Sequence, residues 1–145
     1  MSLRPSAFTF IVMPAFVPAT AVELGGGNLI VSKTLNGELV AGSRFQVTPN
    51  NENWEAFWNT ADFLNVWRWK AKYDTRELGV GVCDGKGWKL QMQHLDHSVT
   101  TGGANAYPSF HSPDQTSLHE ERFGLFLFAV GELLSHKWGL TTRSS

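Results

Sequence analysis

The sequence predicts an α+β domain: an antiparallel β-sheet built from hairpins, with two α-helices, at about 49–63 and 117–137, packed on one face of the sheet. Three observations carry this prediction. Short runs of alternating apolar and polar residues are separated by Asn-Gly or glycine-rich turns, as in hairpins. Two longer segments hold apolar residues at helical spacing. Helical crossovers between the strands are too few for a parallel sheet.

The length of 145 residues suits a single domain, spanning 1–145, with frayed ends at about 1–5 and 140–145. Hydrophobic residues make up 42% of the chain and charged residues 17%, which is typical of a globular protein. The formal net charge of -1 provides no overall field that would attract nucleic acid or an anionic membrane. The lone cysteine, Cys83, lies in an apolar run and is expected to be a buried structural thiol.

The longest N-terminal apolar stretch, 7–22, argues against a membrane partner. Pro14 and Pro18 interrupt it, so it is too broken for a membrane helix of about 20 residues. Only Arg4 precedes it, which is a poor match to a secretory signal. We therefore expect a cytoplasmic protein.

The first third of the chain is expected to be β-structure. Residues 8–13 alternate in a strand that is apolar on both faces and that Pro14 should either end or place at an edge of the sheet. An Asn-Gly pair at 36–37 joins two further runs, 29–35 and 38–47. Because a type I′ turn needs two residues with positive φ, this pair predicts a hairpin.

A first helix is expected over 49–63. Thr48 is the expected N-cap, and Pro49 suits the first turn because its fixed φ matches the helix. The apolar residues of this segment recur on one helical face. They are Trp54, Phe57, Trp58, Ala61 and Leu64.

Residues 66–73 switch to a period of two, which predicts a half-buried strand. Single-strand nucleic-acid binders combine stacking rings and cations on one exposed face. Here the alternation puts the rings on one face and the cations on the other, so we expect the rings in the core and no nucleic-acid partner. The rings are Trp67, Trp69 and Tyr73, and the cations are Arg68, Lys70 and Lys72.

A second hairpin is expected to pair 78–83 with 88–94 through the turn 84–87, in which Asp84 precedes Gly85. A short turn at 95–97 then leads into 98–101. The last helix is expected to begin at the capping box Ser117-Leu118-His119-Glu120 and to end before Gly139. Its apolar positions are Phe123, Phe126, Leu127, Val130, Leu133, Leu134 and Trp138.

The segment 100–108, TTGGANAYP, raises the question of a phosphate cradle. Its glycines lack the spacing of a phosphate loop, and no helix follows them directly. We expect the glycines to give the backbone freedom where a strand leaves the sheet. Asn105, Tyr107 and Pro108 would then fasten the exit as a structural clasp, with a ligand-facing lip as the alternative.

The titratable residues offer little for catalysis. His94 and His97 flank a turn instead of sharing a helix face, and no ligand-type residue lies beside them at metal-binding spacing, so neither a metal nor another cofactor is expected. The alternative function is a hydrolase that uses His94 or His97 with a carboxylate such as Asp84 or Asp96.

A resemblance supports the fold. The chain carries a W-x-x-F-W helix at Trp54, a W-x-W-x-x-x-Y segment at Trp67, a D-G-x-x-W turn at Asp84 and the G-A-N-A-Y-P segment at Gly103. Over about 38–138 these motifs resemble a family of small uncharacterised bacterial proteins, which implies the fold and a bacterial origin but no reaction. The layout is also similar to that of the emfourin-type inhibitors of thermolysin-like metalloproteases, although a shared layout does not imply a shared function.

The sequence therefore predicts a non-catalytic binding or protein-interaction domain, with a protease-inhibitor-like module as one form of it. The partner would be an unknown protein or small molecule, and a homodimer through an edge strand stays open. For the aromatic residues, core packing competes with a partly open pocket beside Asn105 and Tyr107. The candidate binding residues are Trp69, Tyr73, Asp84, Trp88, Asn105 and Tyr107.

Overall fold

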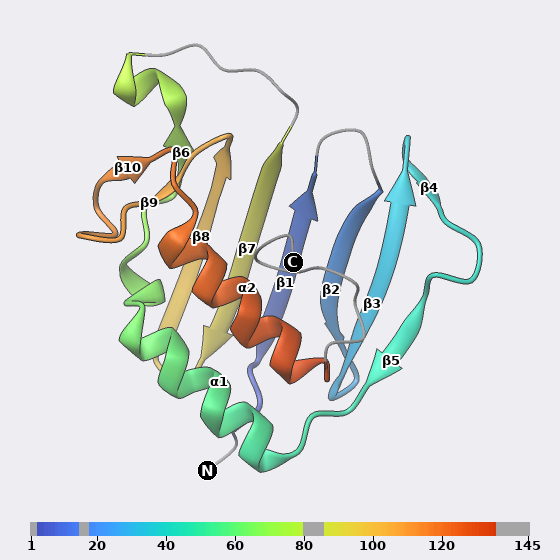
Figure 1. Ribbon diagram of the computed structural model, residues 1–145. Helices are drawn as coiled ribbons and strands as arrows, with labels where there is room; N and C mark the ends of the chain where they lie inside the picture. Colours follow the sequence, from blue (N-terminus) through green and yellow to red (C-terminus); the bar gives the residue numbers. More distant parts are fainter. Residues whose placement is uncertain (1–2, 15–17, 80–85, 136–145) are drawn as a thin grey trace.

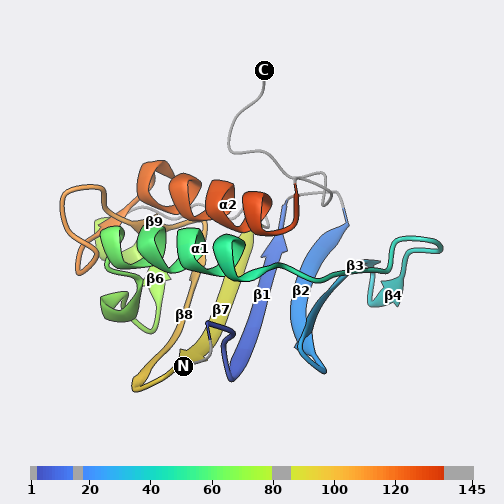
Figure 2. The same ribbon diagram turned by 90° about the horizontal axis from the view of Figure 1, so that it is seen from below.

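The computed structural model describes residues 3–14, 18–79 and 86–135. Two α-helices lie side by side over one face of a large sheet, and within the described ranges the other face carries no α-helix (Figures 1 and 2). The sheet has the order β4-β3-β2-β1-β7-β8-β6, with β5 also pairing with β3, and β9 and β10 form a separate pair. All neighbouring strands are antiparallel except β6 and β8. The predicted α+β fold is confirmed.

The elements follow one another in the order strands, helix, strands, helix. The strands are β1 (Ala7–Met13), β2 (Ala19–Gly25), β3 (Asn28–Leu35), β4 (Glu38–Leu39), β5 (Phe45–Val47), β6 (Tyr73–Asp74), β7 (Gly87–His94), β8 (His97–Ala104), β9 (Tyr107–Pro108) and β10 (Thr116–Ser117). The helices are α1 (Asn51–Phe63) and α2 (Glu121–Leu133), with 3-10 turns at Val66–Arg68 and Thr75–Leu78.

The Asn-Gly hairpin is confirmed. Asn36 and Gly37 have φ values of 54° and 82°, and they join β3 to β4. The run predicted over 38–47 forms two short strands, β4 and β5, and both of them pair with β3.

Helix α1 begins later than predicted. Asn50, and not Thr48, is the N-cap: its side chain accepts from the Asn53 backbone N–H at 2.8 Å. The Asn53 side chain in turn accepts from the Asn50 N–H at 3.0 Å, so two otherwise unpaired donors are satisfied. The predicted apolar face is buried at Trp54, Phe57, Trp58 and Ala61.

The prediction of a strand over 66–73 is wrong. After Asn65, which has a positive φ of 54°, the chain forms a 3-10 turn at Val66–Arg68. Of the predicted strand, only the last residue, Tyr73, joins the sheet. The Trp69 indole N–H donates to the Leu64 carbonyl at 3.1 Å. This bond fastens the segment to the end of α1, where it cannot extend as a strand.

The predicted pairing of the second hairpin, in which 78–83 was expected beside 88–94, is also wrong. Strand β7 pairs with β1 on one side and with β8 on the other, so both of its edges are occupied. Leu78 lies in a 3-10 turn that Gly79 ends with a φ of 73°. The predicted turn at Asp84 and Gly85, and Cys83, lie outside the described residues. The short turn at 95–96 does join β7 to β8.

Helix α2 does not use the predicted capping box. Ser117 belongs to β10 and pairs with Tyr107, and the helix starts at Glu121 and ends at Leu133. The apolar stripe is nevertheless buried as predicted, at Phe123, Phe126, Leu127, Val130 and Leu133. The expected stop at Gly139 lies outside the described residues.

The core fills the space between the two helices and the sheet. Phe8 and Phe10 point from β1 to the helices, and the Phe10 ring meets that of Phe126 edge to face at 5.2 Å. No helix among the described residues has the length and apolar character needed to cross a membrane.

Candidate functional site

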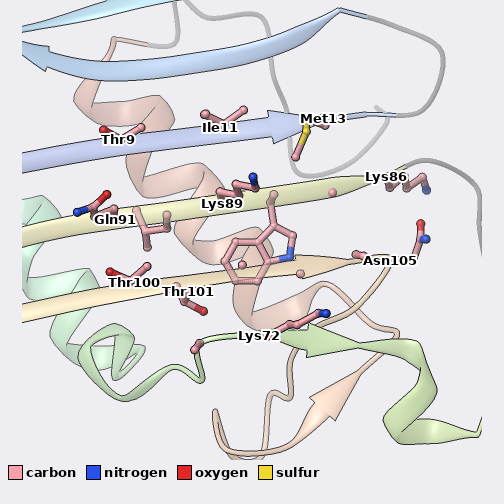
Figure 3. Close-up of a pocket in the computed structure, with 17 residues that line it drawn as sticks. Thr9, Ile11, Met13, Lys72, Lys86, Lys89, Gln91, Thr100, Thr101 and Asn105 are labelled. Atoms are coloured by element: carbon pink, nitrogen blue, oxygen red, sulfur yellow. The ribbon is translucent and has the colours of Figure 1, made fainter.

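The uncovered face of the sheet is hollowed where β1, β7 and β8 lie side by side. A cavity of about 740 Å³ opens there (Figure 3). Because side chains alternate along a strand, Phe8 and Phe10 of β1 face the helices, whereas Thr9, Ile11 and Met13 line the cavity.

Three rows of residues, each running across β1, β7 and β8 in the register of the sheet, form the cavity floor. A polar row is followed by a mixed row and then by an apolar row. Glycines on β7 and β8 bring no side chain to this face, so the surface is hollow at Gly87 and Gly102. The rows are Thr9–Gln91–Thr100, Ile11–Lys89–Gly102 and Met13–Gly87–Ala104.

The charged groups of the cavity wall are all cations. Lys72, Lys86 and Lys89 line it, and among the described residues of the wall there is no carboxylate and no imidazole. Figure 3 places Lys72 across the cavity from Ile11 and Met13. The wall therefore has an apolar side along β1, whereas its cations come from β7 and the residue before it and from the segment beyond β8.

Lys72 has one weak ionic partner. Its Nζ lies 3.8 Å from Asp74 Oδ2, whereas Nη2 of Arg76 lies 2.7 Å from the same oxygen. The hydrogen bond from the Arg76 side chain is the main cause that lowers the pKa of Asp74 to about 2. Because Arg76 holds this carboxylate, the exposed Lys72 ammonium is available to a second anion.

The TTGGANAYP segment continues β8 and then leaves the sheet at Asn105, which has a φ of 56°. The glycines were expected to give the backbone freedom here; neither Gly102 nor Gly103 has a positive φ, and both act through their small size. A Cβ at Gly102 would lie 2.8 Å from the Trp88 carbonyl oxygen, and one at Gly103 would lie 2.2 Å from that of Ala106. The Asn105 N–H donates to the Lys86 carbonyl at 3.2 Å, and Asn105 also lines the cavity.

Four of the six candidate binding residues are core residues. Trp69, Tyr73, Trp88 and Tyr107 are buried, with exposed fractions of 7% or less. The Trp88 ring contacts those of Trp69 and Tyr73, at centroid distances of 5.8 and 6.0 Å. These rings support the floor from beneath, and of the four only Trp88 borders the cavity.

The two remaining candidates are polar. Asn105 is at the cavity, and Asp84 lies outside the described residues. The structure therefore brings Asn105 and Trp88 to the cavity but not the aromatic surface that the sequence suggested.

Several cavity residues were not singled out from the sequence, among them Ile11, Lys89, Gln91 and Thr100. One signal was present: the strand at 8–13 is apolar on both faces, so one of its faces had to lie outside the helix-covered core. The pairing of β1 with β7 joins segments some eighty residues apart and has no local signal.

The two histidines of the hydrolase hypothesis lie against tryptophan rings. His94 is buried and stacks on Trp58 at 4.1 Å with an interplanar angle of 2°, and His97 stacks on Trp67 at 5.2 Å. Neither lines the cavity. Within the described ranges, no group of three or more His, Cys, Asp or Glu residues could hold a metal ion.

No protein-family model matches this chain, and no curated protein matches it. The resemblance to the uncharacterised bacterial family, and the likeness to emfourin-type inhibitors, therefore stay predictions.

Proposed function

We propose that this chain is a non-catalytic binding domain that takes its ligand in the cavity on the open face of the sheet. The observation that carries the proposal is the cavity itself, with a volume of about 740 Å³. Small-molecule sites commonly have volumes of about 300–1,000 Å³ and combine apolar walls with a few polar groups. Ile11 and Met13 supply the apolar wall, and Gln91, Thr100 and Asn105 supply polar groups.

The make-up of the wall favours binding over catalysis. A general acid–base pair needs groups within hydrogen-bond reach of the substrate. The described wall contains neither carboxylate nor imidazole. Lysine nucleophiles are activated by desolvation, whereas Lys72 and Lys89 are exposed. The alternative, a hydrolase using His94 or His97, has less support because their rings stack elsewhere.

A partner at the sheet edges has less support than a ligand in the cavity. The outermost strands, β4 and β6, have two residues each, and β5 has three. Short edge strands offer few free backbone groups for pairing with a second chain, although β6 pairs with β8 only at Gly103 and Ala104, so the homodimer through an edge strand stays a prediction. A protein partner would instead have to insert a side chain or loop into the cavity.

Fragment screening by NMR tests the proposal. Fragments that bind should shift the backbone amide signals of Thr9, Gln91 and Thr100 in preference to those of the helices. Thr100→Trp should abolish these shifts because the indole fills the hollow. Ser98→Trp is the matched control, since Ser98 lies two residues away on the same face of β8 and outside the wall. Hits that map to another surface, or that survive Thr100→Trp, would contradict the proposal.

A further inference from the structure

We infer that the ligand of this cavity is a small organic anion with an aliphatic body. The inference rests on the proposed function and names the ligand class for the same site. It follows from three features of the cavity: the sign of its charge, the position of its apolar side and the lack of an exposed ring.

The charge of the wall comes from Lys72, Lys86 and Lys89, with no acidic group among the described wall residues. Among the described residues Lys89 has no ion pair, and the carboxylate nearest to Lys72 is engaged by Arg76. Two acidic side chains of the open face lie next to this region: Asp74, whose register partner Ala104 belongs to the wall, and Glu23. Glu23 pairs with Thr9 on the far side of β1, at the edge away from the lysines.

Lys89 and Lys72 flank a strip of bare backbone. Lys89 pairs with Gly102, and Tyr73, the neighbour of Lys72, pairs with Gly103 on the other side of β8. With no side chain at Gly102, an anionic group can approach the sheet between the two ammonium groups. Both ammonium groups are exposed, so their attraction for the anion acts through water and should weaken as salt is added.

The apolar side of the cavity fits an aliphatic chain. Ile11 and Met13 are partly exposed along β1, and Ile11 lies in the same row as Lys89. A carboxylate held by the lysines would therefore let its hydrocarbon chain run toward β1. Nucleotide-type ligands are disfavoured because base recognition uses exposed rings for stacking. The aromatic residue of the described wall, Trp88, is 1% exposed.

Decanoate and decanamide make a matched pair of probes, because they share the hydrocarbon chain and differ in charge. Each would be titrated at neutral pH while the amide signals of Ile11, Lys89 and Thr100 are followed. Decanoate should bind at least about tenfold more tightly than decanamide. Added salt should weaken the binding of decanoate and leave that of decanamide unchanged. Acetate, which has the charge without the chain, should cause no saturable shift.

Variants then separate the two parts of the site. The double variant Lys72→Gln/Lys89→Gln should remove most of the preference for decanoate and leave decanamide unchanged. Ile11→Thr should weaken the binding of both ligands. Lys33→Gln, on β3 and outside the wall, is the control for a general loss of positive charge.

The outcomes distinguish the inference from the proposed function. Equal affinity for decanoate and decanamide at the cavity amides would overturn the anion inference and leave the binding function standing. If neither probe shifts these amides while other fragments do, the inference that the ligand has an aliphatic body is wrong. If nothing binds at the cavity, the proposed function fails as well.

Discussion

The indole N–H of Trp88 donates to the carbonyl oxygen of Ala106 at 3.0 Å, across the turn that follows β8. Gly103 lies directly against this bond. A Cβ at Gly103 would come within 2.6 Å of Trp88 Nε1 and 2.2 Å of the Ala106 oxygen. The bond and the missing side chain together hold the chain after β8 against β7, so Gly103 and the Trp88–Ala106 bond form a clasp beside the residues predicted for it, Asn105, Tyr107 and Pro108.

Gly103→Ala is therefore expected to destabilise the domain by about 2–3 kcal/mol, because the methyl group meets backbone that cannot move aside. Urea unfolding followed by tryptophan fluorescence measures the change. Gly87→Ala is the matched control, since its Cβ would meet the mobile end of the Met13 side chain at 3.2 Å. It should cost less than about 1 kcal/mol. Equal losses in the two variants would show that the clasp is not sensitive to size.

Arg122 joins the start of α2 to the end of α1. Its buried guanidinium donates to three backbone carbonyls, those of Leu64 at 2.6 Å and of Ser109 and Phe110 at 2.7 Å. Helix α1 has no basic residue in its last turn, so Arg122 supplies the cation that favours its C-terminal carbonyls. Burial lowers the pKa of Arg122, and the three acceptors compensate for the lost hydration.

Arg122→Met should cost about 2–4 kcal/mol, because the part-buried Ser109 and Phe110 carbonyls lose their donor, whereas the Leu64 carbonyl keeps the Trp69 indole N–H. Thermal and urea unfolding would measure it. Arg76→Met is the control: Arg76 binds Asp74, but 79% of its side chain is exposed. Its loss should stay below about 1 kcal/mol. A small effect at Arg122 would mean that water replaces the guanidinium, and the link between the helices would then be weak.

The buried Tyr73 hydroxyl should make the folded protein less stable at high pH. Desolvation by burial is the main cause that raises the pKa of Tyr73 from 10.0 to about 12. Between these values the unfolded chain loses the phenol proton while the folded chain keeps it, so ionisation favours unfolding. The contribution of Tyr73 to stability is therefore complete below pH 10.0 and falls as the pH rises toward 12.

Tyr73→Phe isolates this effect from other titrating groups. The hydroxyl accepts from the Lys70 N–H at 2.9 Å and donates to the Pro113 carbonyl. At neutral pH its removal should cost about 1–2 kcal/mol. The difference in unfolding free energy between the two proteins should shrink as the pH rises above 10.0. A difference that stays constant with pH would show that Tyr73 ionises equally well in the folded state.

The parts of the fold that the sequence predicted depend on local patterns. The Asn36-Gly37 turn follows from the φ values that those residues tolerate, and the buried stripe of α2 follows from helical periodicity. Residues 66–73 alternate like a strand, but the bond from Trp69 to Leu64 overrides that pattern. The cavity depends on the pairing of β1 with β7 and β8, which is set by tertiary packing. No local window contains Ile11, Lys89 and Gly102 together.

Two phenylalanines of α2 test how far helical periodicity predicts energetics. Phe126 is 0% exposed and its ring contacts those of Phe10, Phe57 and Trp69, whereas Phe128 is 48% exposed. Phe126→Ala should cost about 3–5 kcal/mol, because it removes buried area and leaves a cavity. Phe128→Ala on the same helix should change the unfolding free energy by less than about 1 kcal/mol.

If Phe126→Ala prevents folding, Phe126→Leu gives a milder variant in which a smaller loss is measurable by urea unfolding. A loss at Phe128 as large as that at Phe126 would contradict this assignment of faces. It would mean that the outer face of α2 is covered in solution, because the half-exposed Phe128 ring has less buried area to lose than Phe126. The periodicity of the helix and the burial of its inner face make the same prediction, so this pair of variants tests both at once.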